Sequence, residues 1–345
     1  MKTIKYLLLS GTLVLTFLYS NAQAPLTLPF ESQKSTIIQR IGLTDITIIY
    51  HGPSVKNRKI WGGLVPYNQI WRCGANENTI ISFTSDVMVE GKLLVAGTYG
   101  LHMTPSENKW TIIFSKNYTS WGSFFYKKEE DALRVDVTPT ATAFQECLSY
   151  SFADKKANSV TVELTWEKLT IPFKIEVDVN NVVLANIRNE LRNLQGFSWE
   201  GSYGAANFCL VNNINYDEAL KWIEQSIQIK GNFSNLQVKT GLLEKKGQIK
   251  EADEIRKKAF SLADENQLNQ YGYKLLGENK TTEAIEIFKL NVKKYPIGWN
   301  VYDSLADAYQ KAGDKKQALA NYKLALVKAP DAQKVRIQDE IKKLL

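Results

Sequence analysis

The sequence has few of the side chains that most often bind metals or carry out acid–base catalysis. Its 345 residues include two histidines, His51 and His102, and three cysteines, Cys73, Cys147 and Cys209. Because zinc and related metals prefer imidazole and thiolate ligands, this scarcity argues against a metal centre. We expect neither a metal nor another cofactor.

Motifs for common catalytic mechanisms are also missing. The sequence contains no Gly-x-Ser-x-Gly elbow, no glycine-rich phosphate loop and no calcium loop with alternating aspartates. A glycosidase would need two carboxylates across a cleft. In the tryptophan-rich segment 51–78, Glu77 is the only acidic residue. We therefore assign no catalytic residue and favour a protein that is not an enzyme.

The cysteines leave two interpretations open. Three cysteines cannot all pair within one chain, and no Cys-x-x-Cys spacing occurs. Cys73 and Cys147 could form a disulfide in an exported protein. Alternatively, all three are free thiols that are buried or half-buried.

Proline is almost absent from the second half of the chain. Seven of the nine prolines lie at or before Pro172, and the next is Pro296. Since proline disrupts helix interiors, this proline-free stretch is typical of packed helices. Residues 23–178 carry 16 basic and 16 acidic side chains, and residues 179–345 carry 25 and 20. This small basic excess, without an arginine–aromatic cluster, argues against nucleic-acid binding.

The first 22 residues resemble a secretory signal peptide. Lys2 and Lys5 precede an apolar run that ends before Ser20-Asn21-Ala22. The run is shorter than the roughly 20 residues of a membrane span. We predict cleavage after Ala22 and a periplasmic or secreted mature protein without a membrane span.

Residues 23–178 show the period-two alternation of half-buried strands. Between residues 160 and 167, for example, Val160, Val162, Leu164 and Trp166 alternate with polar residues. Similar segments occur at residues 46–50, 80–83, 99–103, 110–114, 133–137 and 173–178, separated by turn signals. The pattern predicts an all-β antiparallel sandwich. His51 and His102 fall on the strand faces away from the core, where we expect solvent-exposed histidines.

Residues 199–345 repeat with a period of 32 to 34 residues. Small residues that allow close helix packing recur at this spacing, namely Ala219, Ala252, Ala284 and Ala318. The last unit resembles a tetratricopeptide repeat at Tyr302, Leu305, Ala306, Tyr309, Gly313, Asp314, Ala318, Tyr322, Ala325 and Pro330. We predict an all-α solenoid of four such repeats over residues 200–332, closed by a capping helix over 333–345. A connecting helix is expected at 179–198.

The resemblance to tetratricopeptide repeats implies a ligand-facing groove on the first helix of each unit. In the third and fourth units, the corresponding residues are Asn266, Asn269, Tyr273, Asn300, Asp303 and Asp307. This groove could accept an extended peptide or a helix from another envelope or exported protein. The alternative is that the solenoid only braces the sandwich.

A long segment without sustained periodicity, residues 51–78, is rich in glycine, tryptophan and arginine. Such a loop is usually functional or internally packed. Its candidate ligand-binding residues are Arg58, Trp61, Tyr67, Trp71, Arg72, Asn76 and Glu77. Together they could bind a glycan or a small carboxylate-bearing ligand. Alternatively, Trp61 and Trp71 plug one end of the sandwich, and Arg72 pairs with Glu77.

The same region resembles a secreted bacterial family called domain of unknown function 2911. The resemblance lies in residues 58–67, 71–77, 96–101 and 110–114, and with the flanking strands it covers roughly residues 35–178. Members of this family often continue into tetratricopeptide-like repeats, but the family has no activity to transfer. The sequence departs from the family pattern at His51-Gly52 and at Cys73.

Two functional hypotheses follow. The first is an exported, non-enzymatic binding protein whose solenoid contacts another protein. The second is a carbohydrate-binding or carbohydrate-active sandwich that uses the aromatic loop.

Overall fold

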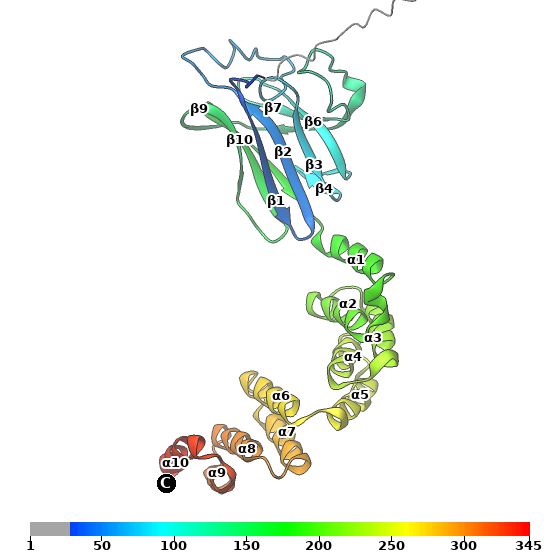
Figure 1. The fold of residues 1–345 in the computed structure, drawn as a ribbon, viewed down its shortest axis with the longest axis vertical. Coiled ribbons are helices and arrows are strands. Elements are labelled where there is room, and N and C mark those ends of the chain that lie inside the picture. Colours follow the sequence, from blue (N-terminus) through cyan, green and yellow to red (C-terminus); the bar gives the residue numbers. More distant parts are fainter. Residues whose placement is uncertain (1–27) are drawn as a thin grey trace, which may run out of the picture. The chain divides into compact units, whose positions relative to one another are not determined.

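The computed structural model describes residues 28–345 (Figure 1). The predicted signal peptide lies outside these residues. The described chain divides into two compact units, residues 28–183 and Leu184–Leu345. All strands of the described part lie in the first unit. No helix within residues 28–345 combines the length and the hydropathy needed to cross a membrane.

The first unit consists of two antiparallel sheets that remain open at their edges. The larger sheet has the order β1-β2-β3-β6-β7-β8, with β1 (Gln33–Ile41), β2 (Thr44–Gly52), β3 (Thr79–Phe83), β6 (Gly97–Thr104), β7 (Trp110–Ser115) and β8 (Asp131–Val137). The smaller has the order β5-β4-β10-β9, with β5 (Lys92–Leu94), β4 (Val87–Val89), β10 (Ser159–Glu176) and β9 (Thr140–Ala153). A 3-10 turn, η1 (Lys128–Glu130), precedes β8. The predicted antiparallel sandwich is confirmed.

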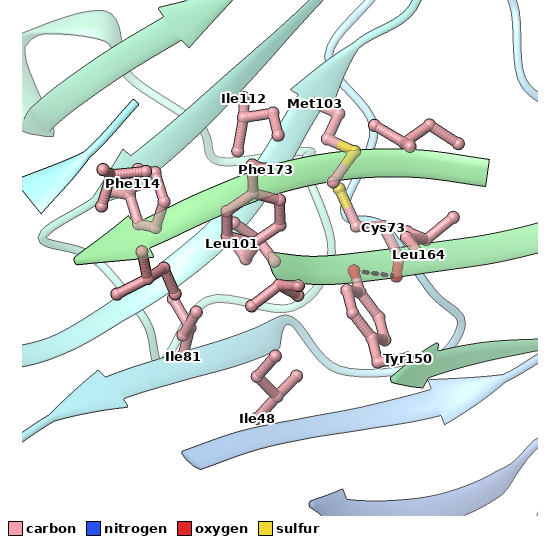
Figure 2. Packing of buried hydrophobic residues seen from close by; sticks show 14 of the residues in the cluster. Ile48, Cys73, Ile81, Leu101, Met103, Ile112, Phe114, Tyr150, Leu164 and Phe173 are labelled. Atoms are coloured by element: carbon pink, nitrogen blue, oxygen red, sulfur yellow. Dashed lines mark hydrogen bonds between the residues drawn. The ribbon is translucent and has the colours of Figure 1, made fainter. Parts of the chain in front are cut away.

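The core lies between the inner faces of the two sheets. Figure 2 shows Leu164 and Phe173 of β10 packed among Ile81, Leu101 and Phe114 of the larger sheet. All five side chains are almost completely buried. The period-two alternation of the sequence thus reflects burial on one face of each strand.

The second unit consists of helices only. After α1 (Val179–Glu190) and the 3-10 turn η2 (Leu194–Phe197), the helices are α2 (Trp199–Asn212), α3 (Tyr216–Lys230), α4 (Phe233–Lys245), α5 (Ile249–Leu262), α6 (Glu265–Gly277), α7 (Thr281–Lys294), α8 (Trp299–Lys311), α9 (Lys315–Lys328) and α10 (Asp331–Leu344). Four antiparallel pairs, from α2/α3 to α8/α9, are followed by α10 (Figure 1). The predicted tetratricopeptide-like solenoid is confirmed.

The repeated alanines explain how the pairs fit together. Ala219, Ala252, Ala284 and Ala318 each lie in the second helix of a pair, and each has an exposed fraction of 0%. A larger side chain there would separate the helices, because helices approach closely only over small residues.

A glycine has the same role within the third pair. A Cβ atom on Gly272 of α6 would lie 2.5 Å from two ring atoms of Phe288 of α7, whereas one on Gly277 would meet nothing within 4 Å.

We expect Gly272→Ala to lower the free energy of unfolding by about 1–3 kcal/mol, because the Phe288 ring must move out of its site. Gly277→Ala is the matched control and should cause no loss. Urea denaturation of both variants checks this, and equal stabilities would contradict the packing described.

Candidate functional site

The two tryptophans of the 51–78 loop pack inside the sandwich. The Trp61 ring lies 5.0 Å from Trp110 of β7 and 5.7 Å from Trp166 of β10, measured between ring centroids. The Trp71 ring stacks on Trp166 at 6.0 Å. This is the packing predicted by the second interpretation of the loop. Both side chains remain half-buried.

Arg58 and Tyr67 stabilise the loop itself. The Arg58 guanidinium donates to the backbone oxygens of Ser54 and Val55. The Tyr67 ring lies against Gly62, whose positive φ of 71° suits glycine. A shallow hollow of about 380 Å³ includes Arg58 and Trp61 in its lining.

Asn76 and Glu77 both contact His51, although 49% of the Glu77 side chain stays exposed. The His51 Nε2 atom lies 2.9 Å from Glu77 Oε2, and its Nδ1 atom lies 3.0 Å from the amide nitrogen of Asn76. The exposed fraction of His51 is only 6%. Our prediction of a solvent-exposed His51 is therefore wrong, because loop side chains cover that face of β2. The predicted Arg72–Glu77 pair is also wrong, since Glu77 bonds to His51.

His102 is buried in a similar way. It lies on the outer face of β6 but has an exposed fraction of 2%. Residues 117–126 cover it, with Ser123 Oγ 3.2 Å from His102 Nδ1 and the Tyr126 ring 5.5 Å away. Burial lowers the pKa of His102 from 6.5 to about 4. The prediction of a solvent-exposed histidine is wrong here too, although the strand face was predicted correctly.

The loop candidates thus separate into distinct groups. Trp61 and Trp71 pack against the core, Asn76 and Glu77 contact His51, and Arg72 extends toward Gly122 in the segment that covers His102, whereas the contacts of Arg58 and Tyr67 lie within the loop.

The cysteines are free thiols. Cys73 and Cys209 are buried, whereas Cys147 is exposed. Figure 2 shows the Tyr150 hydroxyl donating to the backbone oxygen of Cys73, at 3.1 Å. The interpretation without a disulfide is confirmed, but the exposure of Cys147 differs from the expectation.

The predicted groove of the third and fourth repeats is partly filled by contacts between helices. Asp307 accepts hydrogen bonds from Tyr273 and from Tyr322 of α9, both at 2.6 Å. Asp303 is 5% exposed and accepts from Arg336 of α10 at 2.6 Å. Asn266 is exposed, whereas Asn269 and Asn300 are half-buried. Both aspartates thus join neighbouring helices of the stack.

The stack opens one repeat earlier, between α5 and α6. The helices α3 and α4 pack together, as do α7 and α8, but α5 and α6 do not approach along their backbones. Only Ala263 and Asp264 connect them. Two adjoining clefts, of about 390 Å³ and 570 Å³, lie at this junction and share Glu244, Arg256, Tyr271 and Lys274 in their linings. We call this combined hollow the junction cleft.

Aromatic rings line the base of the junction cleft. Phe260 of α5 contacts Tyr271 of α6 with ring centroids 5.1 Å apart, and Phe233 of α4 lies 6.4 Å from Tyr271. Burial raises the pKa of Tyr271. The side chains of these three rings thus bridge two helical pairs whose backbones stay apart.

Charges of both signs surround the aromatic base. Arg256 forms ion pairs with Glu244 and Asp253. The ammonium group of Lys274 lies 5.9 Å above the Tyr271 ring. Sequence analysis did not single out these residues, because they belong to no motif and the repeat pattern does not show where neighbouring pairs separate.

Comparisons with known proteins find a family match in the first unit. Residues 32–175 match the family described as "Protein of unknown function (DUF2911)". The predicted resemblance to that family is therefore confirmed. No curated protein matches the chain.

Solved structures of tetratricopeptide-repeat proteins resemble the helical part. YrrB, described as a TPR protein with an unusual peptide-binding site, is 23% identical, with 47% of this chain and 83% of YrrB covered and a TM-score of 0.28. The C-terminal part of a TPR protein from Cytophaga hutchinsonii is 20% identical, with 47% and 69% covered and a TM-score of 0.30. MamA from Desulfovibrio magneticus RS-1 is 15% identical, with 42% and 82% covered and a TM-score of 0.27.

The buried His102 makes stability depend on pH. Its pKa falls from 6.5 in the unfolded chain to about 4 in the folded protein, so the unfolded state binds the proton first. The contribution of His102 to the free energy of unfolding is therefore fully present above pH 6.5. It is lost as the pH falls toward 4, and the loss amounts to about 3 kcal/mol in total. We expect His102→Gln to lack this contribution. Urea denaturation of both proteins at pH 7.5 and pH 4.5 checks it, and parallel losses in the two proteins would contradict the assignment.

Proposed function

We propose that the protein is an exported, non-enzymatic scaffold whose helical unit binds a polypeptide segment of another envelope or exported protein. The observation that supports this most is the junction cleft, an open hollow in a stack whose other neighbouring pairs are closed. Its lining comes from α2, α4, α5, α6 and α7. A ligand there would contact more than one repeat at once.

The lining of the cleft suits a peptide with an apolar anchor. Binding energy at protein interfaces is concentrated in apolar side chains that enter desolvated pockets, surrounded by a polar rim. Phe260 and Tyr271 offer the apolar base, and Arg256, Lys274 and Glu278 lie among the charged side chains around it. Because charges of both signs are present, the partner segment should carry an aromatic or aliphatic residue flanked by charges of both signs.

Export supports the choice of partner class. The signal-like residues 1–22 would direct the mature chain out of the cytoplasm. Its partners would then be proteins of the envelope or the external medium.

A charge reversal in the cleft tests the binding function. Lys274 is a surface residue with 66% of its side chain exposed, so Lys274→Glu should leave the fold intact. With the immobilised mature protein at a concentration well below the Kd, we expect at least about a tenfold loss in the amount of partner recovered from envelope extract, because a like charge facing the partner costs about 1.4 kcal/mol or more.

Lys323→Glu, at an exposed position of α9 outside the cleft lining, is the matched control and should leave recovery within about twofold of the wild type. Equal recovery with both variants would exclude the junction cleft as the binding site.

Export is tested separately. Amino-terminal sequencing of the protein isolated from its native cells should begin at Gln23, after cleavage behind Ala22. An intact Met1 terminus in the cytoplasmic fraction would disprove export without affecting the cleft.

A further inference from the structure

The segment that covers His102 exposes a group of aromatic rings. Five of the residues 117–126 are aromatic. Four of these side chains have exposed fractions between 40% and 80%, namely Tyr118, Trp121, Phe124 and Phe125. We call these four rings the aromatic patch. Large apolar side chains that are exposed together mark a surface that contacts a protein or a membrane.

The segment that carries the aromatic patch is fixed to the larger sheet by its other residues. Ser123 Oγ lies 3.2 Å from His102 Nδ1, and the Tyr126 ring lies 5.5 Å from the His102 ring. Gly122 lies against the Arg72 guanidinium, where an added Cβ atom would be 3.3 Å from Nη1. Because these contacts face the sheet, the exposed rings lie on the side of the segment that faces away from it. A surface that binds the patch therefore does not have to order this backbone first.

Lysines gather where the two ends of the segment meet. The Lys116 amide donates to the backbone oxygen of Glu130 at 2.8 Å, which brings Lys116 close to Lys127 and Lys128. All three lysines are exposed, and none of them forms an ion pair within residues 28–345. Glu129 and Glu130 offset two of the three charges, so a small net positive charge remains beside the aromatic patch.

The residue types favour a lipid surface over a protein as the binding partner. Protein interfaces are enriched in arginine and depleted of lysine and glutamate. The aromatic patch is instead bordered by lysines and glutamates. Aromatic rings next to lysines are typical of proteins that lie at the boundary of a bilayer, where the rings enter between the headgroups and the lysines attract anionic lipids.

We propose that the aromatic patch binds the surface of a lipid bilayer that contains anionic headgroups. The rings of Trp121, Phe124 and Phe125 enter the boundary between headgroups and acyl chains, while Lys127 and Lys128 interact with lipid phosphates. Such attachment is peripheral and reversible, because a few rings bury little apolar area. The patch belongs to the sandwich unit, and the proposal does not depend on the junction cleft.

Sedimentation with lipid vesicles tests the proposed surface. The mature protein is mixed with vesicles of phosphatidylcholine alone, or with vesicles in which about one third of the lipid is phosphatidylglycerol. We expect saturable binding to the mixed vesicles and at least about tenfold weaker binding to phosphatidylcholine alone, because the lysines are attracted only by the anionic lipid. Absence of binding to the mixed vesicles, or equal binding to both compositions, would overturn the proposal.

Two variants locate the contact. The double variant Phe124→Ser/Phe125→Ser should weaken binding to the mixed vesicles at least about tenfold, because two rings no longer enter the lipid. Phe144→Ser, which removes an exposed ring of β9 outside the patch, is the matched control and should change binding less than about twofold. Both variants should keep a Tm close to that of the wild type, since the rings that they remove are exposed.

Unchanged vesicle binding in the double variant, or equal losses in both variants, would overturn the assignment to the aromatic patch. Recovery of an envelope protein that requires the same two rings, without any binding to vesicles, would assign the patch to a protein instead.

Discussion

A pair of antiparallel helices cannot bury its own apolar face, so the helical unit depends on the packing of each pair against the next. Fully buried residues such as Ala284 and Phe288 show how tightly this packing closes in the third repeat. At the α5/α6 junction the backbones stay apart, and side chains reach across: Phe260 contacts Tyr271, and Lys294 of α7 donates to the backbone oxygens of Phe260 and Ser261. The same constraint that closes the rest of the stack thus leaves apolar surface available at one place. That surface is the basis for the proposed contact with another polypeptide.

The sandwich buries its apolar side chains in a different way from the helical unit. Its two sheets enclose a continuous core, and the 51–78 loop contributes Trp61 and Trp71 to that core. The loop is therefore held by packing and not only by its backbone. Within residues 28–345, buried side-chain atoms without a hydrogen-bond partner occur on both faces of the larger sheet, at Trp61 and Trp110 on the core side and at Asn78 on the side of His102. Each polar group that is buried without a partner reduces stability.

Much of the architecture could be predicted because the residues on the buried face of a strand or helix recur at a regular spacing in the sequence. Alternation at Val160, Val162 and Leu164 predicted a strand, and alanines about 33 residues apart predicted the helical pairs. Strand parity also assigned His51 and His102 to the outer face. Strand parity could not predict that both histidines are buried. It assigns a side chain to one face of the sheet, but it does not predict which loop covers that face. The side chains that cover them come from residues 76–77 and 117–126, which have no periodicity of their own.

The functional surfaces were harder to predict for the same reason. The groove assigned to Asp303 and Asp307 follows the regular repeat pattern, yet both side chains bond to neighbouring helices. The junction cleft instead arises where the regular pattern weakens, and no residue type marks such a gap in advance.

The central claim is that the junction cleft binds the partner. Hydrogen–deuterium exchange of the mature protein, free and in complex with a captured partner, tests it most directly. The account predicts slower exchange on binding in residues 256–282, with little change in α9. Protection confined to the β-sandwich or to α8–α10 would contradict it.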